Sequence, residues 1–201
     1  MCVGGFWVDF VNMRTESYSR ESRVPRMGIG TPVEDAFRRD LTINALFYNI
    51  NTGVVEDFTG KGTADLRAGV VRTPLPPVTT LLDDPLRILR SVRFASRLGF
   101  KMSPDLMEAG QKPAVHDALA AKVSRERVGC EVDQMVRSHH PLRAFQLMAQ
   151  LKLFPVVFPL PPDADALLPF PDSPDVLFEH SMVYLKNMYH LLGDERPVRA
   201  G

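Results

Sequence analysis

The sequence has little of what marks a secreted, disulfide-linked or membrane protein. Its 201 residues contain only two cysteines, Cys2 and Cys130, which lie far apart and have no CxxC partner. Two such thiols match neither a zinc site nor a disulfide framework, so we expect a reducing, intracellular compartment. No apolar run approaches the roughly 18 residues that a membrane helix needs, so we expect no membrane partner. The segment Met1–Met13 lacks the basic region and following apolar run of a secretory signal.

The chain also has no excess of charge of either sign. It carries 24 lysines and arginines against 24 aspartates and glutamates, and 45% of its residues are hydrophobic. The neutral balance argues against binding to nucleic acid through bulk charge, although a local basic face stays compatible with it. The composition is that of a globular chain with one large core or two small ones.

The residue patterns before Val78 predict a mixture of short strands and helices. In chain order we expect a strand (Gly5–Met13), a polar loop (Arg14–Gly30), a short helix capped by Thr31 (Pro32–Arg39), a β-hairpin (Leu46–Ile50 and Val54–Phe58), a glycine-containing turn with a short helix (Asp57–Leu66) and an extended segment (Arg72–Val78).

From Thr79 onward the patterns predict helices. They cover Asp83–Leu98, Pro104–Gln111, Pro113–Ala121, Ser124–Val136 and Pro141–Leu151, followed by a proline-rich linker at Asp163–Pro174 and a last helix at Asp175–Leu192. The sequence therefore predicts an α+β fold, in which an α/β part of about residues 1–78 precedes an all-helical part.

The stretch Asp83–Phe100, DDPLRILRSVRFASRLGF, carries the most distinctive side chains. Acidic residues followed by Pro85 predict a helix start. An apolar stripe then recurs at helical spacing through Ile88, Val92 and Ala95.

Three polar residues of this stretch share one side of the predicted helix. At about 100° per residue, Asp84, Arg87 and Arg90 fall within a sector of roughly 120°, away from the apolar stripe. Guanidinium groups donate hydrogen bonds and a carboxylate accepts them, so together they match the edge of cytosine or adenine. The same pattern is also common on solvated helices, and the three residues alone leave both interpretations open.

Four further segments occur together with this helix segment in a defined order along the chain. The segments are DFVNMRTESY (Asp9–Tyr18), RRDLTINALFYN (Arg38–Asn49), DFTGKGTADL (Asp57–Leu66), the helix segment itself and SRERVGCEVDQM (Ser124–Met135). In this order they resemble the class II tRNA nucleotidyltransferase (CCA-adding enzyme) and bacterial-type poly(A) polymerase family, most closely its eukaryotic members. The resemblance covers about residues 8–158.

The resemblance implies roles for five nucleotide-binding residues. Asp40 would contact the ribose hydroxyls, with Arg39 near the triphosphate. Asp84, Arg87 and Arg90 would act as a protein template that pairs with incoming CTP or ATP. The implied partners are the 3′ end of tRNA and these two nucleotides, and Asp57–Leu66 would be a flexible joint. The implied domains are a partial nucleotidyltransferase head (1–78), a helical neck for RNA binding and nucleotide recognition (79–158), and a linker with a partial body helix (159–201).

The family's first motif, a glycine-rich turn followed by an Asp-x-Asp pair on a strand, is not found in this sequence. By resemblance, that pair binds two Mg²⁺ ions, which activate the primer 3′-hydroxyl and neutralise the leaving pyrophosphate. The only Asp-x-Asp here is Asp163–Asp165, set among prolines, so we assign no metal ligands. Asp9 matches an acid on the neighbouring strand and is the one catalytic candidate. We therefore expect an N-terminally incomplete member with little or no transferase activity.

Several alternatives stay open on the sequence. Poly(A) synthesis differs from CCA addition in whether CTP is used, and a non-catalytic RNA- or nucleotide-binding protein would keep the recognition residues without turnover. A purely helical scaffold would leave the Arg38–Asp40 and Asp84–Arg90 clusters unexplained. Arg125, Arg127 and Glu131 form either an ion-pair network that braces the template helix or a solvated face. The resemblance does not distinguish cytoplasm, nucleus and mitochondrion, and it gives no oligomeric state.

Overall fold

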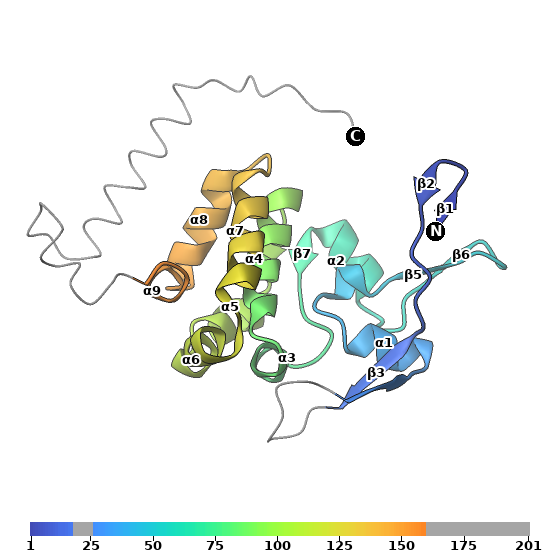
Figure 1. The fold of residues 1–201 in the computed structure, drawn as a ribbon, viewed down its shortest axis with the longest axis horizontal. Coiled ribbons are helices and arrows are strands. Elements are labelled where there is room, and N and C mark those ends of the chain that lie inside the picture. The colour runs from blue at the N-terminus through green and yellow to red at the C-terminus, as the bar shows by residue number, and fades with distance from the viewer. Residues whose placement is uncertain (18–25, 160–201) are drawn as a thin grey trace, which may run out of the picture.

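The fold divides into an N-terminal part of short strands and helices and a C-terminal part of packed helices (Figure 1). The computed structural model describes residues 1–17 and 26–159. The predicted linker at Asp163–Pro174 and the predicted helix at Asp175–Leu192 lie outside the described residues. Within them the α+β class is confirmed.

The N-terminal residues form two separate hairpin ladders. Strand β1 (Cys2–Val3) pairs antiparallel with β2 (Phe6–Trp7), and β3 (Arg14–Ser17) pairs antiparallel with β4 (Arg26–Ile29). The predicted strand over Gly5–Met13 is therefore confirmed only at Phe6–Trp7 and wrong beyond it, because residues 8–13 join no ladder. The predicted loop over Arg14–Gly30 is wrong at its two ends, which pair with each other. A strand needs a neighbour for its backbone groups, and local alternation does not supply one.

The next elements agree with the sequence patterns. Helix α1 (Pro32–Phe37) begins with a capping box, in which the Thr31 hydroxyl accepts from the Glu34 N–H and the Glu34 carboxylate accepts from the Thr31 N–H. A 3₁₀ turn, η1 (Thr42–Asn44), leads to the hairpin of β5 (Phe47–Asn49) and β6 (Val54–Glu56). Helix α2 (Gly62–Ala68) then follows the predicted glycine-containing turn.

A short parallel pair joins the two parts of the chain. Strand β7 (Val70–Val71) lies beside β8 (Lys101–Met102), and the Ser103 N–H donates to the Val71 carbonyl over 2.9 Å. The sequence patterns predict neither strand, because two residues are too few to show an alternation. Helix α4 (Leu86–Leu98) directly precedes β8 in the chain and packs against both strands.

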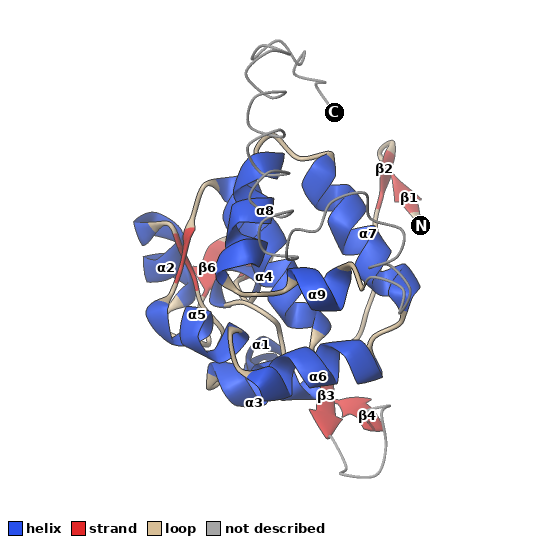
Figure 2. Cartoon of the chain, turned by 90° about the vertical axis from the view of Figure 1, so that its left-hand side faces the viewer, coloured by secondary structure: helices blue, strands red, loops and turns tan. Residues whose placement is uncertain are grey.

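The helical part is built around α4. Its apolar stripe is confirmed, because Ile88, Val92 and Ala95 are completely buried. The remaining helices are α3 (Pro77–Asp83), α5 (Pro104–Gly110), α6 (Pro113–Lys122), α7 (Arg125–Val136), α8 (Pro141–Gln150) and α9 (Phe154–Val157). Both α7 and α8 pack directly on α4, as Figures 1 and 2 show from two sides.

The core lies in the helical part, while several large apolar side chains of the N-terminal part are exposed. Phe6, Trp7, Phe10 and Val11 near the start of the chain and Ile50 at the tip of the β5–β6 hairpin are each more than two thirds exposed. The two-stranded ladders are too small to cover these side chains. In the described part of the chain, no helix combines the length and apolar character that crossing a membrane requires.

Candidate functional site

The segment Arg38–Asp40, between α1 and η1, is organised by the buried carboxylate of Asp35. One Asp35 oxygen accepts from Arg38 Nη2 at 2.6 Å, and the other accepts from Arg39 Nε at 2.9 Å. The Arg14 backbone N–H of β3 donates to the same carboxylate at 3.0 Å. Because Asp35 lies three and four residues before the two arginines, about one helical turn, the local helix geometry brings all three side chains together.

The contacts of Asp35 also set its protonation. Burial opposes the charged form, but hydrogen bonds from the Arg14 N–H and from the Arg38 and Arg39 guanidiniums outweigh burial. The pKa of the Asp35 carboxyl therefore lies below its ordinary value of 3.8. At neutral pH the group is an anion that anchors two cations.

Arg39 is held in place but keeps an accessible surface. Besides its Asp35 contact, Nη1 donates to the Asn44 carbonyl at 2.8 Å, and the guanidinium lies 4.6 Å from the centre of the Phe47 ring. Its side chain is still 34% exposed. A guanidinium with five N–H donors has donors left for an anion that approaches from solvent.

Asp40 is the next residue, and its carboxylate is only 7% exposed. Oδ1 accepts from the Leu41 N–H at 2.9 Å and from Asn44 Nδ2 at 3.2 Å. Oδ2 accepts from Arg90 Nε of α4 at 2.7 Å. These three contacts occupy three of the roughly four lone-pair positions of a carboxylate, so Oδ2 keeps capacity for one more donor.

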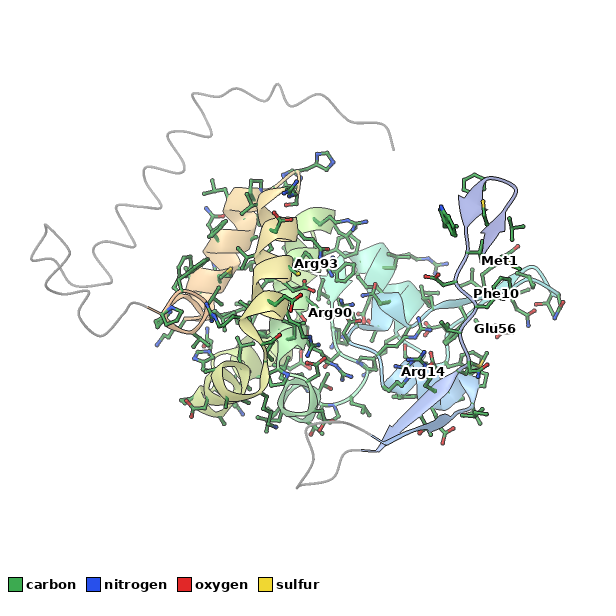
Figure 3. All side chains as sticks on the ribbon, in the orientation of Figure 1. Met1, Phe10, Arg14, Glu56, Arg90 and Arg93 are labelled. Atoms are coloured by element: carbon green, nitrogen blue, oxygen red, sulfur yellow. The ribbon has the colours of Figure 1, made fainter. Side chains whose placement is uncertain are left out.

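Helix α4 contacts the Arg38–Asp40 segment through two arginines that lie one turn apart. Arg87 Nη2 donates to the backbone carbonyl of Arg38 at 2.6 Å, and Arg90 pairs with Asp40. Figure 3 shows Arg90 and Arg93 on α4, between the helical part and the N-terminal part. Two motifs that are separate in the sequence thus form one unit.

The predicted side-by-side arrangement of Asp84, Arg87 and Arg90 on a polar helix face needs correction. Asp84 lies before α4 in an extended conformation, where its Oδ1 accepts from the Leu86 N–H and its Oδ2 from Arg127 Nη2, each at 3.3 Å. Arg87 is only 8% exposed, whereas Arg90 is 35% exposed. The solvated-face interpretation is therefore wrong for Arg87, which is buried against the Arg38 carbonyl, whereas Arg90 keeps about a third of its side chain exposed.

Glu131 of α7 is a buried acid of this site that sequence reasoning left undecided. It is 5% exposed, and its Oε2 accepts from Arg93 Nε at 2.6 Å. Its Oε1 lies 3.7 Å from Arg90 Nη1, a distance for an ion pair rather than a hydrogen bond. The spacing of Glu131 four residues after Arg127 was the available signal, since both project from one face of α7.

Of the proposed bracing network, Arg127 and Glu131 contact the site and Arg125 does not. Arg125 instead donates to the backbone carbonyls of Val156 and Val157 in α9. The network alternative is thus correct for two of its three members, and the third holds the end of the helical part.

The predicted joint at Asp57–Leu66 is a tightly bonded turn. Asp57 accepts from the Thr59 hydroxyl at 2.8 Å and from the Thr63 N–H at 2.9 Å. Burial opposes its charged form, but these hydrogen bonds outweigh burial and hold the pKa of Asp57 below its ordinary value. Gly62 lies so close to η1 that a Cβ there would be 2.6 Å from the Thr42 carbonyl oxygen.

The carboxylates of the described residues do not fit a two-metal site. Asp9 lies exposed in the irregular segment 8–13, and no group of three or more histidine, cysteine, aspartate or glutamate side chains gathers in the described part of the chain. Asp35 and Asp40 are already bound to arginines. The catalytic role of Asp9 stays a prediction, and Asp163–Asp165 lie outside the described residues.

Comparison with family models matches both parts of the chain. Residues 4–72 match the model described as Poly A polymerase head domain. Residues 99–165 match the model described as Probable RNA and SrmB-binding site of polymerase A. The first match includes the Arg38–Asp40 segment, and the second includes α7.

Curated relatives of this chain include tRNA nucleotidyltransferases and a poly(A) polymerase. The chain is 52% identical to the mitochondrial CCA tRNA nucleotidyltransferase of Saccharomyces cerevisiae over 154 residues, which are 77% of this chain and 28% of the relative. It is 39% identical to the tRNA nucleotidyltransferase cca2 of Schizosaccharomyces pombe, over 94% of this chain and 40% of the relative. Poly(A) polymerase I of Escherichia coli is 35% identical over 65% of this chain and 27% of the relative. The chain thus spans well under half the length of these relatives.

Solved structures of a CCA-adding enzyme and of a tRNA nucleotidyltransferase are also similar to this chain. The Bacillus stearothermophilus CCA-adding enzyme in complex with CTP is 27% identical with a TM-score of 0.65, covering 78% of this chain and 36% of that one. A tRNA nucleotidyltransferase complexed with a primer tRNA and an incoming ATP analogue is 28% identical with a TM-score of 0.62, covering 84% of this chain and 47% of that one.

Proposed function

The chain belongs to the poly(A) polymerase and CCA-adding tRNA nucleotidyltransferase family, and on that basis we propose that it carries the nucleotide-recognition and RNA-binding part of an enzyme that adds C and A to the 3′ end of tRNA. The observation that carries this proposal is the joining of Arg38–Asp40 to α4 through Arg87 and Arg90. This junction joins the residues proposed for the sugar and phosphate to two of the three residues proposed for the base.

The positions of several nucleotide-binding candidates support their assigned roles. The remaining acceptor capacity of Asp40 suits a ribose hydroxyl, and the exposed edge of the Arg39 guanidinium suits a phosphate. Asp84 accepts hydrogen bonds, and Arg87 and Arg90 donate them. That donor and acceptor set complements cytosine and adenine, whose edges carry an exocyclic amine beside a ring acceptor, better than uracil.

The proposed division of the chain follows the predicted boundaries. Residues 1–78 act as part of a nucleotidyltransferase head, residues 79–158 as a neck that recognises the nucleotide and binds RNA, and residues 159–201 as a linker with part of a body helix. The RNA-binding model over 99–165 supports the middle unit, and its ligand is the tRNA 3′ end.

Mg²⁺ supplies charge neutralisation and activation of the primer hydroxyl in nucleotidyl transfer. The carboxylates of the described residues do not fit that role, so recognition of nucleotide and RNA is what the described residues support. A non-catalytic nucleotide- and RNA-binding protein is the second candidate function, favoured by the same lack of fit. CCA addition ranks above poly(A) synthesis because the chain is 52% identical to a CCA enzyme and 35% identical to a poly(A) polymerase. We place the protein inside the cell, as the mitochondrial yeast relative suggests.

Calorimetry with CTP, ATP, GTP and UTP tests the proposal on the purified chain. We expect binding of CTP and ATP in preference to GTP and UTP, and loss of that preference in Asp84→Ala. Asp133→Ala is the matched control, because Asp133 lies on the exposed face of α7 in a pair with Arg137. Equal binding of all four nucleotides, or of none, contradicts the proposal.

A further inference from the structure

Glu131 is a buried carboxylate with no assigned contact to nucleotide or RNA. It comes from α7, which belongs to the segment matched by the RNA-binding model, yet its oxygens face Arg90 and Arg93 of α4. Both Glu131 and Arg93 are less than one tenth exposed. A buried charge is costly unless it is paired, so the charge of Glu131 affects the energetics of the arginines that pair with it.

Glu131 belongs to a connected group of four charged side chains whose net charge is zero. Glu131 and Asp40 are the two anions, and Arg90 and Arg93 are the two cations. Arg93 takes one oxygen of Glu131 at 2.6 Å, which fixes the plane of the carboxylate. The other oxygen then faces Nη1 of Arg90. Arg90 is thereby the shared member that connects the Arg93–Glu131 pair to Asp40.

The planar guanidinium of Arg90 couples the orientation of the Asp40 carboxylate to the position of the Glu131 carboxylate. Its N–H groups point in fixed directions, so attraction of Nη1 toward Glu131 sets the direction of Nε toward Asp40. Oδ1 of Asp40 is already occupied by two donors, and the remaining acceptor capacity is on Oδ2, the oxygen that Arg90 contacts. The orientation of Arg90 therefore determines the direction from which Oδ2 of Asp40 can accept a further hydrogen bond.

Helix α7 makes a second contact with the site from the same face. Arg127, one turn before Glu131, donates to Asp84 at 3.3 Å. The two contacts differ in surroundings, because Arg127 is 53% exposed and Glu131 is buried. An exposed pair contributes little, so the buried Glu131 contact is the stronger link between α7 and the site.

We propose that Glu131 is a positioning residue for nucleotide recognition, which orients Arg90 and through it the Asp40 carboxylate, so that the choice of ribose over deoxyribose depends on α7. The inference rests on the proposed function, since it assigns Asp40 to the ribose. A purely structural Glu131 would only neutralise Arg93, and its loss would weaken binding of CTP and dCTP alike.

The ratio of CTP to dCTP affinity separates these two roles. In Glu131→Gln the side chain keeps its size but loses its charge. We expect the ratio to fall about tenfold, the order of one charged hydrogen bond, and the ratio of CTP to UTP affinity to fall by less, because Asp84 and Arg87 are also assigned to the base. Asp133→Asn makes the same carboxylate-to-amide change two residues along α7, in an exposed pair with Arg137, and should leave both ratios at the wild-type value.

A second variant keeps the proposal testable if Glu131→Gln loses its circular dichroism signal. Arg90→Lys keeps the positive charge beside Asp40 but lacks the planar guanidinium, which faces the Asp40 and Glu131 carboxylates at the same time. We therefore expect the same fall in the ratio of CTP to dCTP affinity. A wild-type ratio in either folded variant overturns the positioning role. Failure of the wild-type chain to bind any nucleotide, by contrast, overturns the proposed function itself and the inference with it.

Discussion

The Asp40 carboxylate and the Arg90 guanidinium meet at 2.7 Å although fifty residues separate them along the chain. Asp40 is almost buried and Arg90 is about two thirds covered, so the pair is shielded from water on most sides. It joins a loop of the N-terminal part to the central helix of the C-terminal part. The attachment of the two parts and the proposed nucleotide recognition therefore involve the same two side chains.

Removal of Arg90 should destabilise the fold as well as the site. In Arg90→Ala the buried Asp40 charge loses its only side-chain cation among the contacts of the described residues, and we expect a loss of about 1–2 kcal/mol in unfolding free energy. Urea denaturation followed by circular dichroism measures the change. Arg137→Ala removes an exposed pair and should shift stability by less than about 0.5 kcal/mol. Equal losses in the two variants would contradict the structural role of the pair.

Stability should decline in acid partly because of Asp35. Its pKa is lower in the folded chain than its ordinary value of 3.8, so its charge contributes stability that is fully present above that value. The contribution is lost as the pH falls through the folded-state pKa. We expect Asp35→Asn to cost about 1.5–3 kcal/mol at neutral pH and to make the acid decline shallower. Unfolding free energies measured between about pH 6 and pH 3 test this, and parallel curves for the two proteins would rule it out.

Two glycines in helices should respond in opposite directions to alanine. A Cβ at Gly62 would lie 2.6 Å from the Thr42 carbonyl oxygen, so Gly62→Ala should cost about 1–3 kcal/mol. Gly129 in α7 has open space where a Cβ would be, and Gly129→Ala should stabilise the chain by about 0.5–1 kcal/mol through helix propensity. Thermal unfolding of both variants measures the difference. A stabilised Gly62→Ala would show that α2 and η1 are less closely packed than the structure indicates.

Removal of Mg²⁺ should leave base selection intact. In the proposed function Asp84 and Arg87 act on the base edge through hydrogen bonds, which need no metal, whereas Mg²⁺ lowers the repulsion among phosphates. Addition of a chelator should therefore weaken CTP and UTP binding by the same factor. Calorimetry with and without the chelator gives both affinities. A CTP to UTP ratio that collapses without Mg²⁺ would mean that the metal, rather than the α4 residues, organises the base contacts.

The local features of the fold follow from the sequence because their physics is local. The Thr31 capping box, the hairpin that turns through Gly53 and the apolar stripe of α4 each depend on residues a few positions apart. The order of the motifs likewise indicates the family without any coordinates. A resemblance of this kind assigns roles to Asp40 or Arg87, but it leaves the contacts of those side chains open.

Tertiary structure alone decided which charged side chains of different elements meet. Residues 8–13 alternate like a strand but have no ladder partner, and β7 and β8 pair although each is too short to be recognised. Arg87 fits a solvated helix face on periodicity and is buried against the Arg38 carbonyl. Glu131 reaches Arg93 across 38 positions of sequence. The sequence by itself determined the secondary-structure elements and the types of side chain that are available. The packing of α4 between the N-terminal part and α7 determined which charged side chains pair, because desolvated charges must find partners wherever the fold places them.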